Sequence, residues 1–449
     1  MTDLWFEHAL LEDGWATDVR VVIEGTKIAA IHTGVAAGLD DRQYAVGVPG
    51  MPNLHSHAFQ RAMAGLSEVA GIGGNDNFWT WRTQMYRLVD RLTPDHVRAI
   101  AAMAQIEMLE AGFTRTGEFH YLHNDPSGNA YASPAIMAQA LADAAAGTGI
   151  GLSLLPVFYA HSDFDGVAPT YAQRRFVTSL DSFVRLFDAS CSAVASLGDA
   201  IVGIAPHSLR AATPYELGAL ASLAPGKPMH IHIAEQTREV DACVAWSGYR
   251  PVAWLLDNLP VDSRWCLVHA THVDDHELEA MAAVGAIVGL CPVTEANLGD
   301  GVFPARQWRA LGGAWGIGSD SNVLIDVSEE LRLLEYGQRL IHRSRNVLAP
   351  FGGSTGAALF REACAGGGRA LGVEAGAMRA GVSADIVALR KDETGVTADT
   401  LLDRWIFARG RSAVEAVWRA GRQCVSDGRH VARDQVVRSY TNVLAEILA

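Results

Sequence analysis

The chain lacks the sequence features of an exported or membrane-spanning protein. Its N-terminus, Met1-Thr2-Asp3-Leu4, carries an acidic residue and does not continue into the basic and then apolar segment of a secretory signal. No uninterrupted apolar stretch reaches membrane-spanning length, and the best candidate, around residues 281–290, is interrupted by glycine. These absences predict a soluble protein located in the cytoplasm, with no membrane partner.

Cysteine is scarce and unpatterned. The chain has six cysteines with neither a CxxC motif nor the spacing of a disulfide framework, and several lie in apolar stretches: Cys191, Cys243, Cys266, Cys291, Cys364 and Cys424. We expect reduced thiols, most of them in the core.

Positive charge is in deficit, since 36 lysines and arginines face 50 aspartates and glutamates and leave a formal net charge of −14. Such a surface repels phosphate groups, which argues against nucleic acid or an anionic membrane as a partner. An anionic substrate would therefore have to be held by locally placed arginines.

The remaining pattern is that of a large α/β protein. At 449 residues and 49% hydrophobic content, the chain can form one large domain and a smaller one. Apolar runs alternate with long helical stretches, which is typical of βα units around a parallel sheet. Eight candidate inner strands predict a (β/α)8 TIM-like barrel with its site at the strands' C-terminal ends: Ala45–Leu54, Phe113–Phe119, Gly151–Phe158, Ala200–Ala205, Pro228–Ile233, Trp265–Val268, Ala286–Cys291 and Ala314–Gly318.

Short strands and turns occupy both ends of the chain. Val19–Glu24 and Lys27–Ile31 flank a Gly25-Thr26 turn, and similar short strands return at Ala384–Leu389 and Val414–Trp418. We expect residues 1–48 and 376–449 to form one composite β-sandwich domain beside a barrel of residues 49–375. Residues 58–90, which include Gly71–Gly74 and Phe78–Arg82, are predicted to form a long loop that acts as a lid or binding element.

A His-x-His pair follows the first inner strand. In extended backbone, residues two apart project to the same side, so His55 and His57 can face one ion together. By itself this signal is weak, but three other strand ends supply His232, His269 and Asp320. We predict His55, His57, His232 and Asp320 as metal ligands, a nitrogen and oxygen set that suits Zn²⁺ with one open position for water.

Two further groups are placed for chemistry on that water. Glu235 follows His232 by three residues and is predicted to transfer protons. His269 is predicted to orient the water. Asp320 is predicted to be a catalytic residue as well as a metal ligand. A buried structural histidine beside a surface glutamate is the alternative reading of His232 and Glu235.

The order of these residues resembles the amidohydrolase superfamily in its mononuclear deaminase branch. Four stretches are similar, more narrowly, to formimidoylglutamate deiminases of histidine degradation: His55–Arg61, Phe78–Arg82, Glu118–Tyr121 and Thr294–Gly301. The resemblance covers essentially the whole chain and implies the barrel, the composite β domain and a homodimer. No lysine suited to bridge two metals is evident at the expected strand end, which favours one Zn²⁺ per chain.

The resemblance implies a small dicarboxylate amidine, N-formimino-L-glutamate, as the substrate, hydrolysed to N-formyl-L-glutamate and ammonia. Buried carboxylates need matching cations, and arginine is the usual partner. By resemblance, five residues are assigned to substrate binding: Gln60, Arg82, Tyr121, His207 and Arg210. Glu295, which could hold one of these arginines, is left unassigned.

Two other functions stay open at this point. A deaminase of a heterocyclic amine such as guanine or cytosine would use the same metal motifs, but would need stacking aromatics more than two arginines. A metal-stabilised binding barrel without turnover would need neither Glu235 nor His269, so their presence favours an enzyme.

Overall fold

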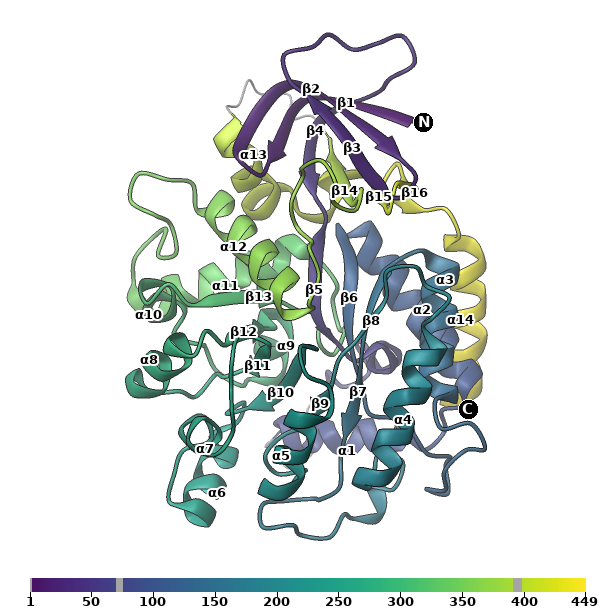
Figure 1. Cartoon of the computed structure of the whole chain (residues 1–449), viewed down its shortest axis with the longest axis vertical. Helices are drawn as coiled ribbons and strands as arrows, with labels where there is room; N and C mark the ends of the chain where they lie inside the picture. The colour runs from purple at the N-terminus through teal and green to yellow at the C-terminus, as the bar shows by residue number, and fades with distance from the viewer. Residues whose placement is uncertain (1, 70–75, 391–397) are drawn as a thin grey trace.

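The computed structural model describes residues 2–69, 76–390 and 398–449 (Figure 1). Its strands form one mixed sheet, at the top of Figure 1, and two parallel sheets beneath it. The fold is therefore α/β, with helices packed outside the parallel sheets.

The mixed sheet joins the two ends of the chain. Its order is β17-β16-β15-β14-β4-β1-β2-β3, and β14 pairs with β4 in an antiparallel register that sets Ile386 opposite Pro49. The predicted hairpin near the N-terminus is confirmed by the antiparallel pairing of β2 with β3. The strands are β1 (Thr2–Leu11), β2 (Gly14–Glu24), β3 (Lys27–His32), β4 (Arg42–Pro49), β14 (Ile386–Leu389), β15 (Val414–Arg419), β16 (Arg422–Ser426) and β17 (Arg429–His430).

The first predicted inner strand, Ala45–Leu54, is wrong in its extent, because it is two strands in two sheets. Strand β4 ends at Pro49 in the mixed sheet, and β5 (Met51–Ser56) begins the first parallel sheet. Gly50 lies between them, where a Cβ atom would sit 2.2 Å from Thr114 Oγ1. Only glycine allows the backbone to pass this close as it changes sheets.

The two parallel sheets carry the polar strand ends. The first holds β5, β6 (Phe113–His120), β7 (Gly151–Phe158) and β8 (Ile201–Val202), with β9 (Ala205–Pro206) beside β7; the second holds β10 (Met229–Ile233), β11 (Trp265–His269), β12 (Ile287–Leu290) and β13 (Ala314–Ile317). Isolated parallel bridges link them, Ile204 with Met229 at one side and Ser56 with Asp320 at the other. Strand ends far apart in sequence therefore meet.

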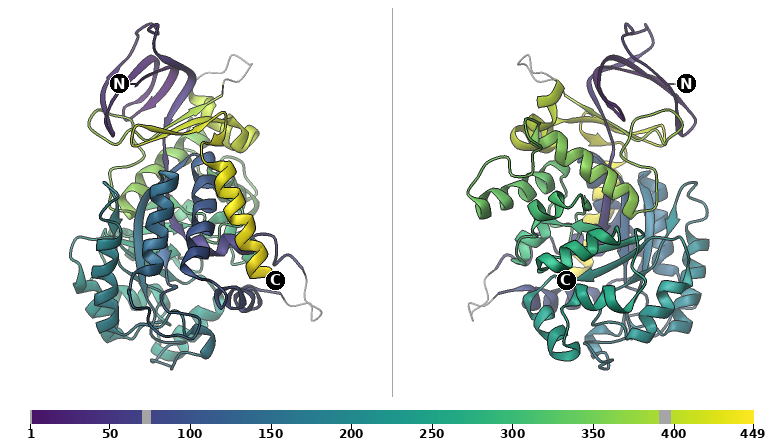
Figure 2. Two further views of the ribbon diagram at one scale, coloured as in Figure 1. Left: turned by 90° about the vertical axis from the view of Figure 1, so that its right-hand side faces the viewer. Right: turned by 60° about the vertical axis from the view of Figure 1, so that its left-hand side comes forward.

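Helices follow most of these strands and lie outside them (Figures 1 and 2). They are α2 (Pro94–Glu110), α3 (Ile136–Thr148), α4 (Leu180–Ala193), α5 (Pro214–Leu223), α6 (Thr237–Ser247), α7 (Pro251–Asn258), α8 (Asp275–Ala283), α9 (Pro292–Leu298), α10 (Ala305–Ala310), α11 (Val327–His342) and α12 (Thr355–Ala370). A short α13 (Ala398–Arg404) follows. The terminal helix α14 (Arg433–Leu448), which the sequence analysis missed, packs along α2 (Figure 2).

The predicted loop of residues 58–90 is partly helical. A 3₁₀ helix η1 (Ala58–Met63) and an α-helix α1 (Phe78–Val89) lie within it, and Gly71–Gly74 lies outside the described residues. Asn77 caps α1 by accepting from the Trp79 backbone N–H, while Thr80 Oγ1 accepts from the Asn77 N–H. The capping box stabilises the start of α1, the helix that carries Arg82.

The structure also bears on the expectations about the cysteines and about membrane-spanning segments. The six cysteines form no disulfide, and all but Cys191 are buried. Among the described residues, no helix combines the length and the apolar character needed to cross a membrane.

Candidate metal centre and active site

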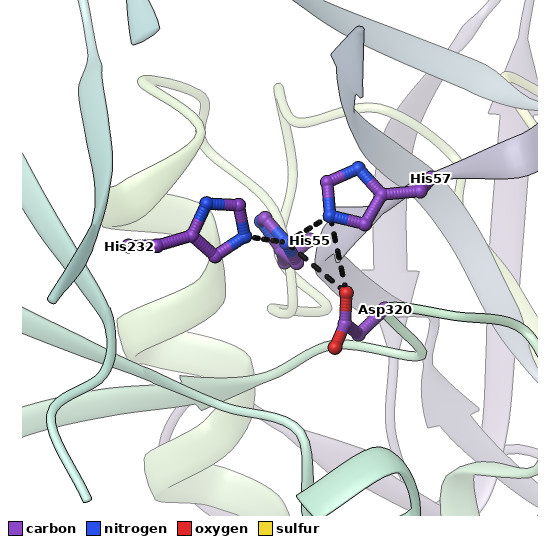
Figure 3. A group of neighbouring side chains, drawn as sticks. All are labelled: His55, His57, His232 and Asp320. Carbon is purple, nitrogen blue, oxygen red and sulfur yellow. Dashed lines mark hydrogen bonds and ion pairs between the residues drawn. The ribbon is translucent and has the colours of Figure 1, made fainter. Parts of the chain in front are cut away.

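Four buried side chains meet where strands of the two parallel sheets end (Figure 3). They are His55 at the end of β5, His57 just beyond it, His232 on β10 and Asp320 after β13, and one ligand atom of each lies within 4.8 Å of the others. Asp320 Oδ1 is 3.2 Å from His57 Nε2 and 3.4 Å from His55 Nε2. This is the set predicted from the sequence.

The hydrogen bonds of the imidazoles show that a cation fits between them. His57 Nδ1 donates to the Phe119 carbonyl (2.9 Å) and His232 Nδ1 donates to the His207 carbonyl (3.0 Å), because a carbonyl can only accept. In the neutral rings the Nε2 atoms of His57 and His232 are therefore unprotonated, and each directs a lone pair outwards. They lie 3.1 and 3.0 Å from His55 Nε2.

One proton on His55 Nε2 could satisfy only one of these two contacts. Burial lowers the pKa of His55 to about 3, so protonation does not resolve the conflict at neutral pH. A divalent ion among the three nitrogens and the Asp320 carboxylate would turn the opposed lone pairs into ligands, and three imidazoles with one carboxylate suit Zn²⁺.

A buried hydrogen-bond network holds Asp320 in place. The Ser319 N–H donates to Asn53 Oδ1 (3.0 Å), and Asn322 Nδ2 donates both to Ser56 Oγ and to the Asp320 carbonyl (3.1 Å each). Asp320 and Asn322 both have positive φ, +43° and +56°, a conformation that is uncommon for L residues but is adopted most readily by Asp and Asn. The network thus joins the ends of β5 and β13 and fixes the direction of the carboxylate.

Glu235 and His269 lie beside the cluster, as predicted. His269 Nε2 is 3.7 Å from Glu235 Oε1 and 3.8 Å from Asp320 Oδ2, and all three side chains are buried. Burial raises the pKa of Glu235 to about 7, although the charge of His269 opposes that shift. A carboxyl group with this pKa can both accept and donate a proton near neutral pH.

His269 is positioned by a residue that the sequence analysis left unassigned. Its Nδ1 lies 3.2 Å from Glu295 Oε1, and the same carboxylate oxygen accepts from the Cys291 N–H (2.9 Å). Burial opposes a charge on His269, but Glu235, Glu295 and Asp320 together raise its pKa to about 10. Among the described residues Glu295 pairs with no arginine. Two signals in the sequence pointed to it: its place just after the seventh predicted strand, and its position within Thr294–Gly301.

The five residues assigned to substrate binding line one cavity together with His57, His232, Glu235, His269 and Asp320. They are Gln60, Arg82, Tyr121, His207 and Arg210. Gln60 Nε2 donates to the Tyr121 hydroxyl (2.9 Å), while Gln60 Oε1 is buried without a partner among the described residues. The structure therefore brings every predicted site residue to one place.

The two arginines have no counter-ion there. Neither Arg82 nor Arg210 forms an ion pair or hydrogen bond with another described residue, and Arg210, only 7% exposed, has a buried Nε without a partner. Burial opposes the charge on Arg210, but nearby Glu239 is the main group that raises its pKa. A buried guanidinium without a direct partner is costly unless an anion completes it.

Comparison with known proteins agrees with this geometry. The sequence profile described as "Amidohydrolase family" matches residues 46–424, which is most of the chain. The chain belongs to the amidohydrolase family. A second profile, "Formimidoylglutamate deiminase HutF, N-terminal domain", matches residues 1–45.

Several known proteins are similar over all or most of the chain. The chain is 48% identical to formimidoylglutamate deiminase of Pseudomonas aeruginosa, and the match covers 100% of both chains. It is 26% identical to a 5-methylthioadenosine/S-adenosylhomocysteine deaminase of Natronomonas pharaonis over 87% of this chain and 82% of that one. The crystal structure of an amidohydrolase from Brucella melitensis superposes with a TM-score of 0.97 at 51% identity, covering 100% of both chains.

Proposed function

We propose that the chain catalyses zinc-dependent hydrolytic deimination of N-formimino-L-glutamate to N-formyl-L-glutamate and ammonia, a step of histidine degradation. One observation carries the proposal: two arginines that pair directly with no described residue line the same cavity as Glu235 and members of a buried His/His/His/Asp cluster. The full-length similarity to a formimidoylglutamate deiminase supports the same substrate.

The side chains divide the reaction between them. When bound, the divalent ion supplies Lewis-acid chemistry, which lowers the pKa of a water and makes it nucleophilic at neutral pH. Glu235 takes a proton from the attacking water and passes it to the terminal formimino nitrogen, and the remaining hydroxyl proton follows by the same carboxylate, so that this nitrogen leaves as ammonia. His269, held by Glu295, orients the water by donating to it. The water oxygen ends in the formyl group, and the C–N bond to the terminal nitrogen breaks.

The same cavity provides for the two carboxylates of the substrate. Arg82 and Arg210 each offer a fork of N–H donors, and such charge-assisted pairs are the strong hydrogen bonds of buried sites. Gln60, Tyr121 and His207 complete the hydrogen bonds around the glutamate portion. A heterocyclic amine would leave both arginines facing an uncharged ring, so the cavity favours the dicarboxylate over guanine or cytosine.

The finer architecture is also a proposal. We infer that the two parallel sheets close into one (β/α)8 barrel over residues 49–375, which is supported by the bridges Ile204–Met229 and Ser56–Asp320. Residues 1–48 and 376–449 would form the β-sandwich, with a buried cluster from both ends that includes Phe6, Ile386 and Trp418. One Zn²⁺ per chain, a homodimer and a cytoplasmic location complete this proposal.

The proposal is tested by ammonia release. The purified chain should release ammonia from N-formimino-L-glutamate much faster than from guanine, cytosine or adenosine. Faster release from any of these heterocycles would contradict the proposed substrate, while release from none would contradict the proposed chemistry.

A further inference from the structure

A second cavity of about 270 Å³ lies against the active-site cavity. The two share Arg82, Tyr86 and Arg210 in their linings, so these side chains form the partition between them. Trp79 and Arg238 line only the outer cavity. We call this outer cavity the arginine chamber, defined by Trp79, Arg82, Tyr86, Arg210 and Arg238.

The chamber gathers three positive charges around one indole. The guanidinium carbons of Arg238, Arg82 and Arg210 lie 4.5, 4.7 and 5.8 Å from the centre of the Trp79 ring. Cation–π attraction holds each of them there, but three like charges at this spacing repel one another. In a chain with a net charge of −14, such a local concentration of cations requires a specific reason.

Counter-charge within the chamber is incomplete. Asp163 and Glu239 also line it, yet none of the three arginines forms an ion pair with either carboxylate or with any other described residue. One oxygen of Glu239 is occupied by the Glu235 N–H (3.3 Å). The chamber therefore keeps three guanidiniums available to an anion that arrives from outside.

The three arginines differ in depth. Arg238, at the start of α6, is exposed, Arg82 on α1 is half-buried, and Arg210 is buried in the partition. Three positive charges thus lead from the surface to the active-site cavity, past the carboxylates of Asp163 and Glu239. A lined path of this kind raises the local concentration of oppositely charged ligands and speeds their association.

Resting on the proposed function, we propose that the arginine chamber is the access route for a dicarboxylate substrate, with Arg238 as the residue that captures it first. A carboxylate pairs with Arg238 over Trp79, passes to Arg82, and reaches Arg210 as the formimino end approaches Glu235. Arg238 then determines the association rate, and the inner arginines determine how tightly the substrate is held.

The test compares Arg238→Gln with Arg185→Gln, an exposed arginine of α4 that lines neither cavity. At low ionic strength, Arg238→Gln should lower kcat/KM for N-formimino-L-glutamate about three- to tenfold relative to that control, while kcat stays unchanged. The difference should shrink towards zero in about 0.5 M salt, where the Debye length is only a few ångströms. Arg238→Lys, which keeps the charge, should restore most of the rate.

A binding measurement separates this inference from the proposed function. Association of glutarate, a dicarboxylate without an amidine, can be followed by stopped-flow tryptophan fluorescence without turnover. Arg238→Gln should slow association and leave dissociation nearly unchanged. Equal association rates in the Arg238→Gln and Arg185→Gln variants, or failure of Arg238→Lys to restore the rate, would overturn the capture role. Absence of ammonia release by the unmodified chain would instead overturn the proposed function.

Discussion

Replacing Arg210 with methionine is the most direct test of how the site recognises its substrate. The side chain is 7% exposed, lines the active-site cavity, and has a buried Nε that no other described residue satisfies. Methionine keeps most of the apolar stem and removes the guanidinium. The variant therefore removes a charge that the folded chain alone does not pair directly.

The expected loss follows from one charge-assisted hydrogen bond to a buried carboxylate. Such a bond contributes about 1.5–3 kcal/mol. Since 1.4 kcal/mol corresponds to a factor of ten, kcat/KM for N-formimino-L-glutamate should fall about 12- to 140-fold. A small formamidine without carboxylates has no such bond to lose, so its kcat/KM should change less than about threefold, within about 0.7 kcal/mol.

Stability provides the second half of this test. Arg210 makes no direct ion pair or hydrogen bond with a described residue, although nearby Glu239 raises its pKa, so Arg210→Met should lower the thermal midpoint less than the loss of a directly paired buried arginine does. Arg115 is the matched control, because it is also buried but pairs with Asp199 and donates to the Leu152 carbonyl (3.2 Å). Arg115→Met should lower the midpoint, because it leaves those groups unpaired.

The assay is ammonia release from both substrates, with thermal unfolding of each variant measured in the same buffer. The ratio of the two kcat/KM losses is the informative quantity, since a general folding defect would depress both alike. Equal losses on both substrates, or a midpoint for Arg210→Met as low as that for Arg115→Met, would refute the assignment of Arg210 to a substrate carboxylate.

Four other outcomes are expected. Glu235→Gln should reduce turnover on the order of 10²–10⁴-fold while the metal is retained; metal loss in elemental analysis would instead make Glu235 a ligand. Chelation should abolish activity and Zn²⁺ restore it, with about one ion per active chain; two ions would contradict the ligand set. Asn322→Gly, which tolerates the positive φ but removes the amide, should weaken metal affinity about ten- to a hundredfold in a chelator competition, and unchanged affinity would exclude a positioning role. Burial lowers the pKa of His123 to about 4, so the folded chain resists the proton that the unfolded chain binds below about pH 6.5, and stability falls as pH drops through this range. Between pH 7 and pH 5, His123 should therefore lower the free energy of unfolding of the unmodified chain by about 2 kcal/mol. Measured by urea unfolding, the His123→Gln variant should lose about 2 kcal/mol less over the same pH range, and an equal loss in both proteins would contradict the lowered pKa of His123.

The sequence predicted which four residues form the buried His/His/His/Asp cluster, because each of them stands at the end of a predicted parallel strand. Two residues apart on a strand end, His55 and His57 must face the same side, and parallel strands bring their C-terminal ends to one edge. His232 and Asp320 then follow from the positions of the strands that they terminate. The same reasoning located Glu235 and His269, and resemblance located the five residues that share their cavity.

Other features depend on contacts between segments that are distant in sequence. The predicted strand ran through Gly50 although Pro49 and Pro52 flank it, since only the packing of Thr114 against Gly50 shows that the backbone passes from one sheet to another there. Glu295 became interpretable only when the structure set its carboxylate 3.2 Å from His269 Nδ1. Apolar periodicity and strand-end position are properties of single segments, whereas a hydrogen-bond partner is a property of two.

The arginine chamber shows the same limit most clearly. Trp79 and Arg82 belong to α1, Arg210 follows β9, and Arg238 belongs to α6, so no spacing rule connects them. Composition alone indicated that an acidic chain would need local arginines for an anionic substrate. Only the tertiary packing decided which arginines surround one indole, because like charges are brought together by the fold that holds them and not by their order in the chain.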